Sequence, residues 1–314
     1  MRQRLSPVRL ATFAGILAAA PLLASDRLER SFDLQPGGRL RLETSVGRVR
    51  VTGKPGSGAH LTVNAHGHDL DEILTFRFDE SPTSVTISAR SKHHFFSFRS
   101  GSVEFDLEVP SETSVDIETS GGPIEASWLH APAKLDTSGG SISVHDLNAN
   151  LQAHSSGGPI HVRDIRGDSR VNTSGGGIEA SRLQGKLTAE TSGGPISLDE
   201  ISGDADLHTS GGGIRIRNAG GRVMAETSGG SIDAAFAKGN SRGGSLESSG
   251  GGITVAVDPE VGLSIDAEAD HVQSDLPLRV QGEISRRSLR GSLGNGGERL
   301  RLRTSGGGIR IQAL

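Results

Sequence analysis

Two carboxylates and an imidazole recur at a fixed interval in the second half of the chain. Glu190, His208 and Glu226 follow one another at steps of 18 residues. If one step is one turn of a repetitive structure, the two glutamates lie about 9.6 Å apart, because neighbouring strands are about 4.8 Å apart. Glycoside hydrolases place their carboxylates about 5 to 9.5 Å apart. A carbohydrate-active enzyme is therefore one hypothesis, although alternating charge along a repeat places the same residues for structural reasons alone.

Histidine is the other residue type that could carry chemistry, since the chain has 11 histidines and no cysteine. His66 and His68 would share one face of a strand, and His93 and His94 form a second pair. A zinc site needs three converging ligands, and nothing in the sequence brings the pairs together. Calcium is disfavoured because the turns, such as 211–214, lack the aspartate of calcium-binding solenoids. We expect no metal and no cofactor.

The segment 92–99 is the most unusual stretch outside the repeats. Phe96 and Phe98 would share one face of a strand and Phe95 the other, so a one-sided sheet cannot bury all three rings. Two interpretations stay open: these rings form the core of a cap, or Phe95, Phe96, Phe98 and Arg99 form an exposed contact surface. We find no nucleophile elbow, phosphate-binding loop or dinucleotide fingerprint, and we assign no catalytic residue.

A repeated sequence motif should determine where the carboxylate and imidazole side chains lie. The motif Thr/Ser-Ser-Gly-Gly-x-Ile returns seven times at steps of 18 residues, with its second serine at Ser120, Ser138, Ser156, Ser174, Ser192, Ser210 and Ser228. It returns again at Ser249 and Ser305, and a degenerate copy begins at Thr44. Such a fixed period is the signature of a solenoid, in which each repeat stacks on its neighbours.

Apolar and polar residues alternate within each repeat, which indicates strands. Counted from the motif isoleucine as position 0, positions 2, 5, 9 and 11 are mainly apolar, and positions 10 and 12 are mostly polar. We therefore predict an all-β, single-stranded β-solenoid with 18-residue coils. Its interior should hold a single file of the isoleucines Ile142, Ile160, Ile178 and Ile196, and a ladder of buried, hydrogen-bonded hydroxyl groups from the motif threonines. Turn glycines at 167, 185, 203, 221 and 239 are expected to need backbone angles closed to other residues.

The chain divides into four parts by composition. Residues 1–24 contain three arginines, no acid and an apolar run over 10–23, which predicts a secretory signal peptide. The run is too short to span a bilayer, so we expect no transmembrane segment after cleavage. Alternating strands over 25–110 should cap the solenoid, 111–253 should form the regular coils, and 254–314 should form a second β-rich cap with a final coil.

Formal charge disfavours nucleic acid as a partner. The chain carries a net charge of −4, which becomes −7 without the arginines of the signal segment. The absence of cysteine excludes disulfides and thiolate metal sites. Glycine is abundant, at 45 residues, and only 33% of the residues are hydrophobic, which favours a thin, repetitive architecture over a thick core.

The order of these features resembles a known family. The chain has strands that end in an apolar-Val-Pro segment at Pro110, then the repeated Thr-Ser-Gly-Gly-x-Ile motif, the stretch 291–297 and a last motif at Ser305. In this order it resembles the bacterial family of exported "putative adhesins" of unknown function. The TSGG/GDI repeats of that family relate it to head-GIN adhesin-like domains. The resemblance covers residues 30–314. It implies an exported, single-stranded, right-handed β-helix with no established enzymatic activity. The aspartate that many members carry before the motif isoleucine is missing here, as at Pro123 and Ser141.

We therefore expect a non-enzymatic, adhesin-like protein, exported to the periplasm or the cell surface, whose long polar face contacts an envelope protein or glycan. One alternative is a polysaccharide lyase or glycoside hydrolase that uses Glu190 and Glu226, and Glu190→Gln in activity screens would separate the two. The other is a structural envelope element that assembles through its end coils, which light scattering without residues 254–314 would test.

Overall fold

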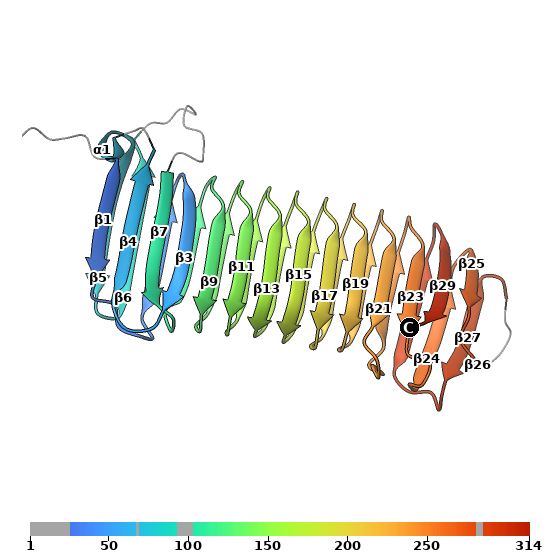
Figure 1. Cartoon of the computed structure of the whole chain (residues 1–314). Helices are drawn as coiled ribbons and strands as arrows, with labels where there is room; N and C mark the ends of the chain where they lie inside the picture. Colours follow the sequence, from blue (N-terminus) through green and yellow to red (C-terminus); the bar gives the residue numbers. More distant parts are fainter. Residues whose placement is uncertain (1–25, 67–68, 93–102, 281–284) are drawn as a thin grey trace, which may run out of the picture.

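The computed structural model describes residues 26–66, 69–92, 103–280 and 285–314. These residues form an all-β structure in which two long sheets face each other along one elongated body (Figure 1). One short helix, α1 (Leu70–Ile73), is present, and Asp69 caps it by accepting a hydrogen bond from the Asp71 N–H. The all-β class expected from the sequence is therefore confirmed, and within the described ranges no helix is long and apolar enough to cross a membrane.

The first sheet, sheet A, has 14 strands. In spatial order these are β1 (Arg27–Phe32), β4 (Ala59–Ala65), β7 (Val103–Pro110), β3 (Arg48–Lys54), β9 (Ile124–Leu129), β11 (Ile142–Leu147), β13 (Ile160–Arg166), β15 (Ile178–Gln184), β17 (Ile196–Ile201), β19 (Ile214–Ala219), β21 (Ile232–Phe236), β23 (Ile253–Val257), β29 (Gly308–Ala313) and β25 (His271–Ser274).

The second sheet, sheet B, has 15 strands. Their spatial order is β26 (Arg279–Val280), β27 (Ser288–Leu293), β24 (Leu263–Glu268), β28 (Arg299–Thr304), β22 (Gly244–Ser248), β20 (Val223–Thr227), β18 (Ala205–Thr209), β16 (Leu187–Thr191), β14 (Ser169–Thr173), β12 (Leu151–Ser155), β10 (Ala133–Thr137), β8 (Ser114–Thr119), β2 (Arg39–Thr44), β6 (Ser84–Ser91) and β5 (Leu74–Ser81).

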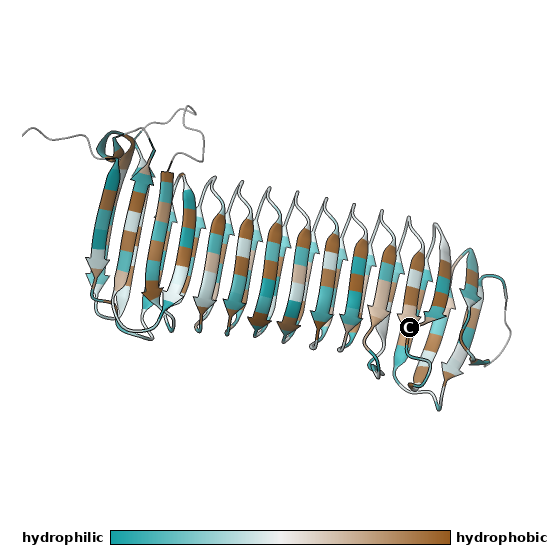
Figure 2. Ribbon diagram, in the orientation of Figure 1, coloured by the Kyte–Doolittle hydropathy of each residue, from teal (hydrophilic) through white to brown (hydrophobic). Residues whose placement is uncertain are grey.

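Equivalent residues of successive repeats are neighbours in the parallel part of both sheets. In sheet A, Ile142 pairs with Ile160, Ile160 with Ile178, and Ile178 with Ile196. All four side chains are fully buried, so the predicted interior file of isoleucines is confirmed. Brown bands at matching heights on the strands in Figure 2 trace this stacking of like residues. Burial of these aliphatic columns between the sheets supplies the main driving force for the fold.

The motif threonines form the predicted hydroxyl ladder. Eight of the threonine and serine hydroxyl groups at this position donate to a backbone carbonyl of the preceding turn, and seven of the eight also accept from an N–H of their own turn. Thr191, for example, donates to Gly176 O at 2.8 Å and accepts from Gly194 N at 3.3 Å. The donors are Thr137, Ser155, Thr173, Thr191, Thr209, Thr227, Ser248 and Thr304. Thr119, at the start of the series, is buried without a hydrogen-bond partner for its hydroxyl.

The turn glycines are required for two different reasons. Gly185 and Gly239 have φ of 127° and 78°, as expected for turns that only glycine adopts easily. Gly203 and Gly221 have no positive φ, so the expectation was wrong for them. A Cβ atom on Gly221 would instead lie 2.1 Å from the carbonyl oxygen of Gly203. Close approach of successive turns, and not the backbone angle, excludes a side chain there.

Among the strands that the structure describes, antiparallel pairing occurs only near the two ends of the body. At one end, β4 pairs antiparallel with β1 and β7, and β5 pairs antiparallel with β6. Four phenylalanines pack here: the ring centroid of Phe76 lies 5.8 Å from that of Phe78 and 6.4 Å from that of Phe105, and the ring centroid of Phe32 lies 5.9 Å from that of Phe78. At the other end, β27 pairs antiparallel with β24 and β26.

Both ends also depart from sequence order. Strand β3 lies next to β9, with Val49 beside Ile124, although residues 55–123 separate them in sequence. Strand β28 lies between β22 and β24, with Leu302 beside Leu246. The degenerate first motif and the last motif therefore extend the regular stack directly, and the intervening segments pack outside them.

Candidate functional site

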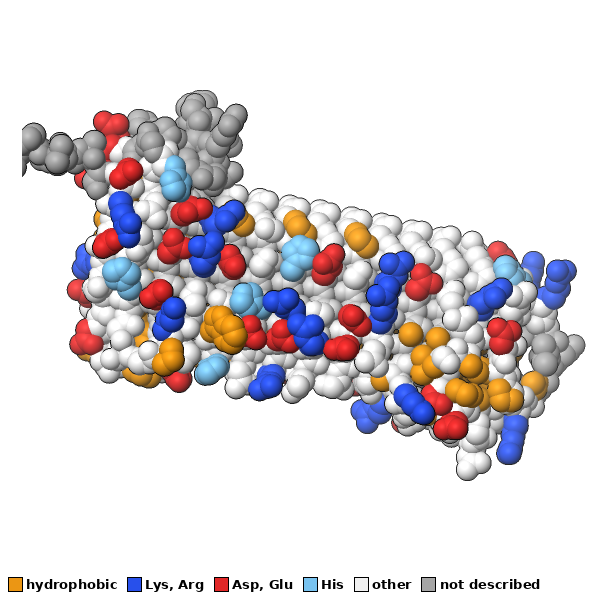
Figure 3. Space-filling view, viewed as in Figure 1, with side chains coloured by type: hydrophobic (Ala, Val, Ile, Leu, Met, Phe, Trp, Pro, Cys, Tyr) orange, Lys and Arg blue, Asp and Glu red, His pale blue; other side chains and the backbone are white. Residues whose placement is uncertain are grey.

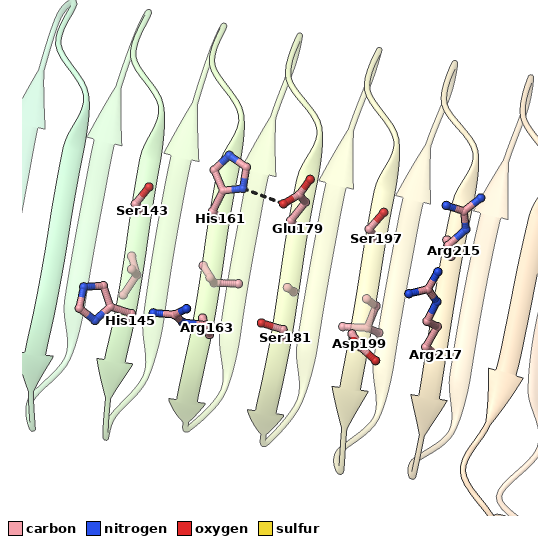
Figure 4. A pocket seen from close by; sticks show the side chains of 14 residues that line it. Ser143, His145, His161, Arg163, Glu179, Ser181, Ser197, Asp199, Arg215 and Arg217 are labelled. Carbon is pink, nitrogen blue, oxygen red and sulfur yellow. Dashed lines mark hydrogen bonds and ion pairs between the residues drawn. The ribbon is translucent and has the colours of Figure 1, made fainter.

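The outward side chains of sheet A form a shallow groove that crosses several strands. Because position 0 and position 2 of each strand point inward, positions 1 and 3 point to solvent. Strands β11 to β19 place Ser143, His145, His161, Arg163, Glu179, Ser181, Ser197, Asp199, Arg215 and Arg217 side by side (Figure 4). These residues line a shallow depression of about 440 Å³, which we term the face groove.

Small and charged side chains alternate in the face groove. Ser143, Ser181 and Ser197 lie between longer side chains. His161 Nδ1 lies 3.1 Å from Glu179 Oε2, whereas Arg215 and Arg217 form no ion pair with any residue that the structure describes. The groove therefore offers donors and acceptors to a ligand over several strands. Figure 3 shows charges of both signs along this face.

A second column lies beside the face groove on the same strands. Six non-glycine residues at position 4 have φ between 52° and 59°: Trp128, Asp146, Asp164, Arg182, Glu200 and Asn218. The pairing register passes over them, since His145 pairs with Arg163 and Leu147 with Ile165. Each is thus an unpaired left-handed residue at the same place of its strand, an outward bulge of the backbone that keeps both Val144 and Leu147 directed inward.

This bulge column could have been found in the sequence. The inward positions 2 and 5 are three residues apart, whereas strict alternation requires an even step. Asp146, Asp164 and Asn218 also belong to the residue types that tolerate left-handed angles best. The apolar column at position 5 was predicted from the sequence, but the bulge that its spacing requires was not.

The bulge column lines a depression of about 770 Å³, which we term the bulge groove. Its best-defined contact joins two neighbouring turns: Arg182 Nε and Nη2 donate to the two carboxylate oxygens of Asp164 at 2.6 Å and 2.8 Å. At one end, His145 Nδ1 lies 2.9 Å from Asp146 Oδ2, and the His145 ring meets the Trp128 ring edge-on at 6.2 Å. The groove is thus polar with one exposed aromatic ring.

Pairing with Arg182 changes the pKa of Asp164 in this groove. The hydrogen bonds from Arg182 lower the pKa of Asp164 below its ordinary value of 3.8, and burial opposes them. Because the pKa of Asp164 is lower in the folded state, the pair stabilises the fold at pH values above the pKa of the unfolded state. This contribution is lost as the pH falls through the folded pKa. Both side chains are partly exposed, so solvent weakens the effect on stability.

We expect the variant Arg182→Gln to raise the titration midpoint of Asp164 toward 3.8. The neutral amide removes both the positive charge and the bidentate geometry that favour the carboxylate. Carbon NMR of the Asp164 carboxyl group during an acid titration measures the midpoint. Arg170→Gln, on the other sheet, is the control and should leave it unchanged. An unaltered midpoint in Arg182→Gln would contradict the assignment.

The residues considered for catalysis lie on the opposite sheet. Glu190 pairs with His208, and His208 with Glu226, so the structure brings the three together on β16, β18 and β20. His208 Nδ1 lies 3.3 Å from Glu226 Oε2, and its Nε2 lies 3.4 Å from Asp206. Both glutamates are exposed to solvent. Neither sits in the apolar environment that raises the pKa of a glycosidase acid.

A family comparison agrees with this repetitive β architecture. The family model described as Toastrack DUF4097 matches residues 40–312, which is most of the chain. The chain belongs to the Toastrack DUF4097 family. None of the curated proteins is similar enough to this Toastrack chain to count as a relative.

The solved structures to which the Toastrack chain is similar have low sequence identity to it. A "putative adhesin" from Bacteroides fragilis has 12% identity and a TM-score of 0.40, and the alignment covers 92% of this chain and 97% of that one. A "putative adhesin" from Parabacteroides distasonis has 11% identity, a TM-score of 0.43 and the same coverage of both chains.

Several predicted sites of the Toastrack chain fall outside the described residues. These are the signal segment, the contact surface of Phe95, Phe96, Phe98 and Arg99, and the histidines at 68, 93 and 94. His66 is described, and its Nε2 lies 3.5 Å from Glu104 Oε2. Among the described residues, no three His, Cys, Asp or Glu side chains gather in a way that could hold a metal ion.

Proposed function

We propose that the chain is a non-enzymatic binding protein of the bacterial envelope, and that the outer face of sheet A holds its protein or glycan ligand. The observation that carries this proposal is the pair of grooves that crosses the five strands from β11 to β19. Enzyme pockets enclose most of a small ligand. An open groove with repeated polar groups instead suits an extended ligand held by many separate contacts.

The proposal also includes the architecture of the chain and its location in the cell. Each 18-residue repeat would make one turn of a right-handed β-helix, because crossover connections between parallel strands are right-handed in nearly all proteins. The antiparallel strands at both ends would cap the stack and protect its edges from pairing with other chains. The basic and apolar residues over 1–24 favour export to the periplasm or the cell surface.

A bulky residue on the floor of the face groove should block binding. We expect Ser197→Trp, on β17, to reduce binding of the mature chain to isolated bacterial envelopes by at least tenfold in a sedimentation assay. Thr188→Trp is the matched control because Thr188 is also half-buried but lies on β16 of the other sheet. Melting temperatures of both variants should match the wild type. Equal binding by both variants would contradict a ligand site on sheet A.

A second candidate function is carbohydrate cleavage by Glu190 and Glu226. The observation in its favour is their position on either side of His208 in one column. Their solvent exposure weighs against it, since a general acid at neutral pH needs a raised pKa. Polysaccharide degradation by the wild type that Glu190→Gln abolishes would favour the enzyme over the binding protein.

A further inference from the structure

Trp128 occupies a position that is unfavourable for a tryptophan in two ways. It is the only tryptophan of the chain, and 54% of its surface is exposed. Its φ of 59° is a left-handed angle, which is a strained conformation for a bulky aromatic residue. The surrounding backbone fixes this angle: Gly53 lies so close that a Cβ atom there would be 1.9 Å from the Trp128 carbonyl oxygen.

Intramolecular contacts explain other members of the bulge column but not Trp128. Aspartate and asparagine tolerate the left-handed angle, and Arg182 gains two short hydrogen bonds to Asp164. The ring of Trp128 gains one edge-on contact with His145. Residues held in strained backbone conformations gather at functional sites, so strain and exposure together suggest that the ring serves a ligand.

The surroundings of Trp128 distinguish a sugar from a protein partner. Aromatic hot spots of protein interfaces sit in well-packed pockets from which neighbouring contacts exclude water. Here the neighbours in the bulge groove are polar, among them Asp146, Asn148 and Asp164. The other large apolar residues that are exposed in the described part of the chain, Met224, Val280 and Leu314, lie on other strands or at the chain end. A lone ring among carboxylates and amides fits a pyranose, which has an apolar face and a rim of hydroxyl groups.

Charge in the bulge groove favours an uncharged ligand. Three carboxylates (Asp146, Asp164, Glu200) and two guanidinium groups (Arg166, Arg182) line it, and Arg182 is already paired with Asp164. No surplus of positive charge is left to bind a polyanion. Carboxylates and amides do accept and donate the hydrogen bonds that neutral hydroxyl groups need.

The spacing of the column suits a linear polymer. Its members lie on neighbouring strands, which are about 4.8 Å apart. That step is close to the length of one pyranose unit, so successive sugars could meet equivalent positions along the axis of the stack. Many such contacts, each weak, would add up along one chain.

We infer that the bulge groove binds a neutral, linear, β-linked polysaccharide, with one sugar ring stacked on Trp128. This inference rests on the proposed binding function of sheet A and specifies its ligand. Because the chain has one tryptophan, its fluorescence reports on this ring alone. The probes are soluble hexamers of β-1,4-linked glucose, N-acetylglucosamine and mannose, with the matching dimers and a polygalacturonate hexamer for comparison.

At least one neutral hexamer should shift the tryptophan emission and bind in calorimetry at least tenfold more tightly than its dimer and than polygalacturonate. Trp128→Asn should lose at least tenfold in affinity while its melting temperature stays equal or rises, because asparagine tolerates the left-handed angle. Trp128→Phe should keep most of the affinity, and Met224→Asn, an exposed position on sheet B, should keep all of it.

The inference fails if none of the three hexamers binds at millimolar concentration, or if Trp128→Asn binds as well as the wild type. Tighter binding of polygalacturonate would overturn the neutral ligand. If no hexamer binds but Ser197→Trp still abolishes envelope binding, the saccharide inference falls and the binding function of sheet A stands. Tryptophan quenching by an envelope protein, with no response to sugars, would assign the ring to a protein partner.

Discussion

The variant Gly194→Ala is expected to lose more than about 4 kcal/mol of unfolding free energy, whereas Gly193→Ala should lose about 1 kcal/mol or less. A Cβ atom on Gly194 would lie 2.1 Å from the carbonyl oxygen of Gly176 and 2.4 Å from its carbon. Both are backbone atoms of the preceding turn, so relief of the clash requires the stack to separate. On Gly193 the nearest atom, Gly175 O, would be at an ordinary 3.4 Å.

Urea denaturation followed by circular dichroism measures both variants, and resistance to a protease serves if Gly194→Ala is too unstable for an equilibrium curve. The two glycines are adjacent and neither has a positive φ, so the pair isolates close approach from backbone conformation. The same crowding recurs at the second glycine of each motif: Gly122, Gly140, Gly158, Gly176, Gly194, Gly212, Gly230 and Gly251. Equal stability of the two variants would contradict the close stacking of the turns.

The hydroxyl ladder gives the second large effect. Thr191 is 6% exposed, and its hydroxyl bonds to both Gly176 O and Gly194 N. We expect Thr191→Val to lose about 1 to 3 kcal/mol, since it keeps the shape but leaves these two backbone groups without partners. Thr191→Asp should lose more than about 4 kcal/mol, because it places a charge in the core opposite a carbonyl oxygen.

Thr191→Ser is the matched control, because Ser155 and Ser248 already occupy the equivalent position with the same hydrogen bonds. It should remain within about 1 kcal/mol of the wild type, the cost of one buried methyl group. Thermal and urea unfolding of the three variants give the order of stability. Similar melting temperatures for Thr191→Val and Thr191→Asp would show that this side chain does not point into the core.

The candidate site was only partly visible in the sequence. The column of Glu190, His208 and Glu226 was predicted correctly because all three occupy the same repeat position. The left-handed bulge at Trp128 was missed. Its tryptophan gives no local signal for that angle, and only the uneven step between inward columns indicates an extra residue. The contact surface predicted from the sequence was instead Phe95, Phe96, Phe98 and Arg99, which lie outside the described residues.

The sequence alone determined the all-β class, the side-chain columns and the inward threonines, because parallel strands with matching patterns pair in the register that buries every apolar position. The placement of Val49 beside Ile124 and of Leu302 beside Leu246 came only from the tertiary structure. The physical reason is the distance in sequence over which each feature is specified. The pairing register is specified again in every repeat. The placement of an end segment depends instead on which exposed sheet edge it covers, and the repeat pattern does not specify that edge. The grooves likewise arise only when side chains from successive turns are brought onto one face.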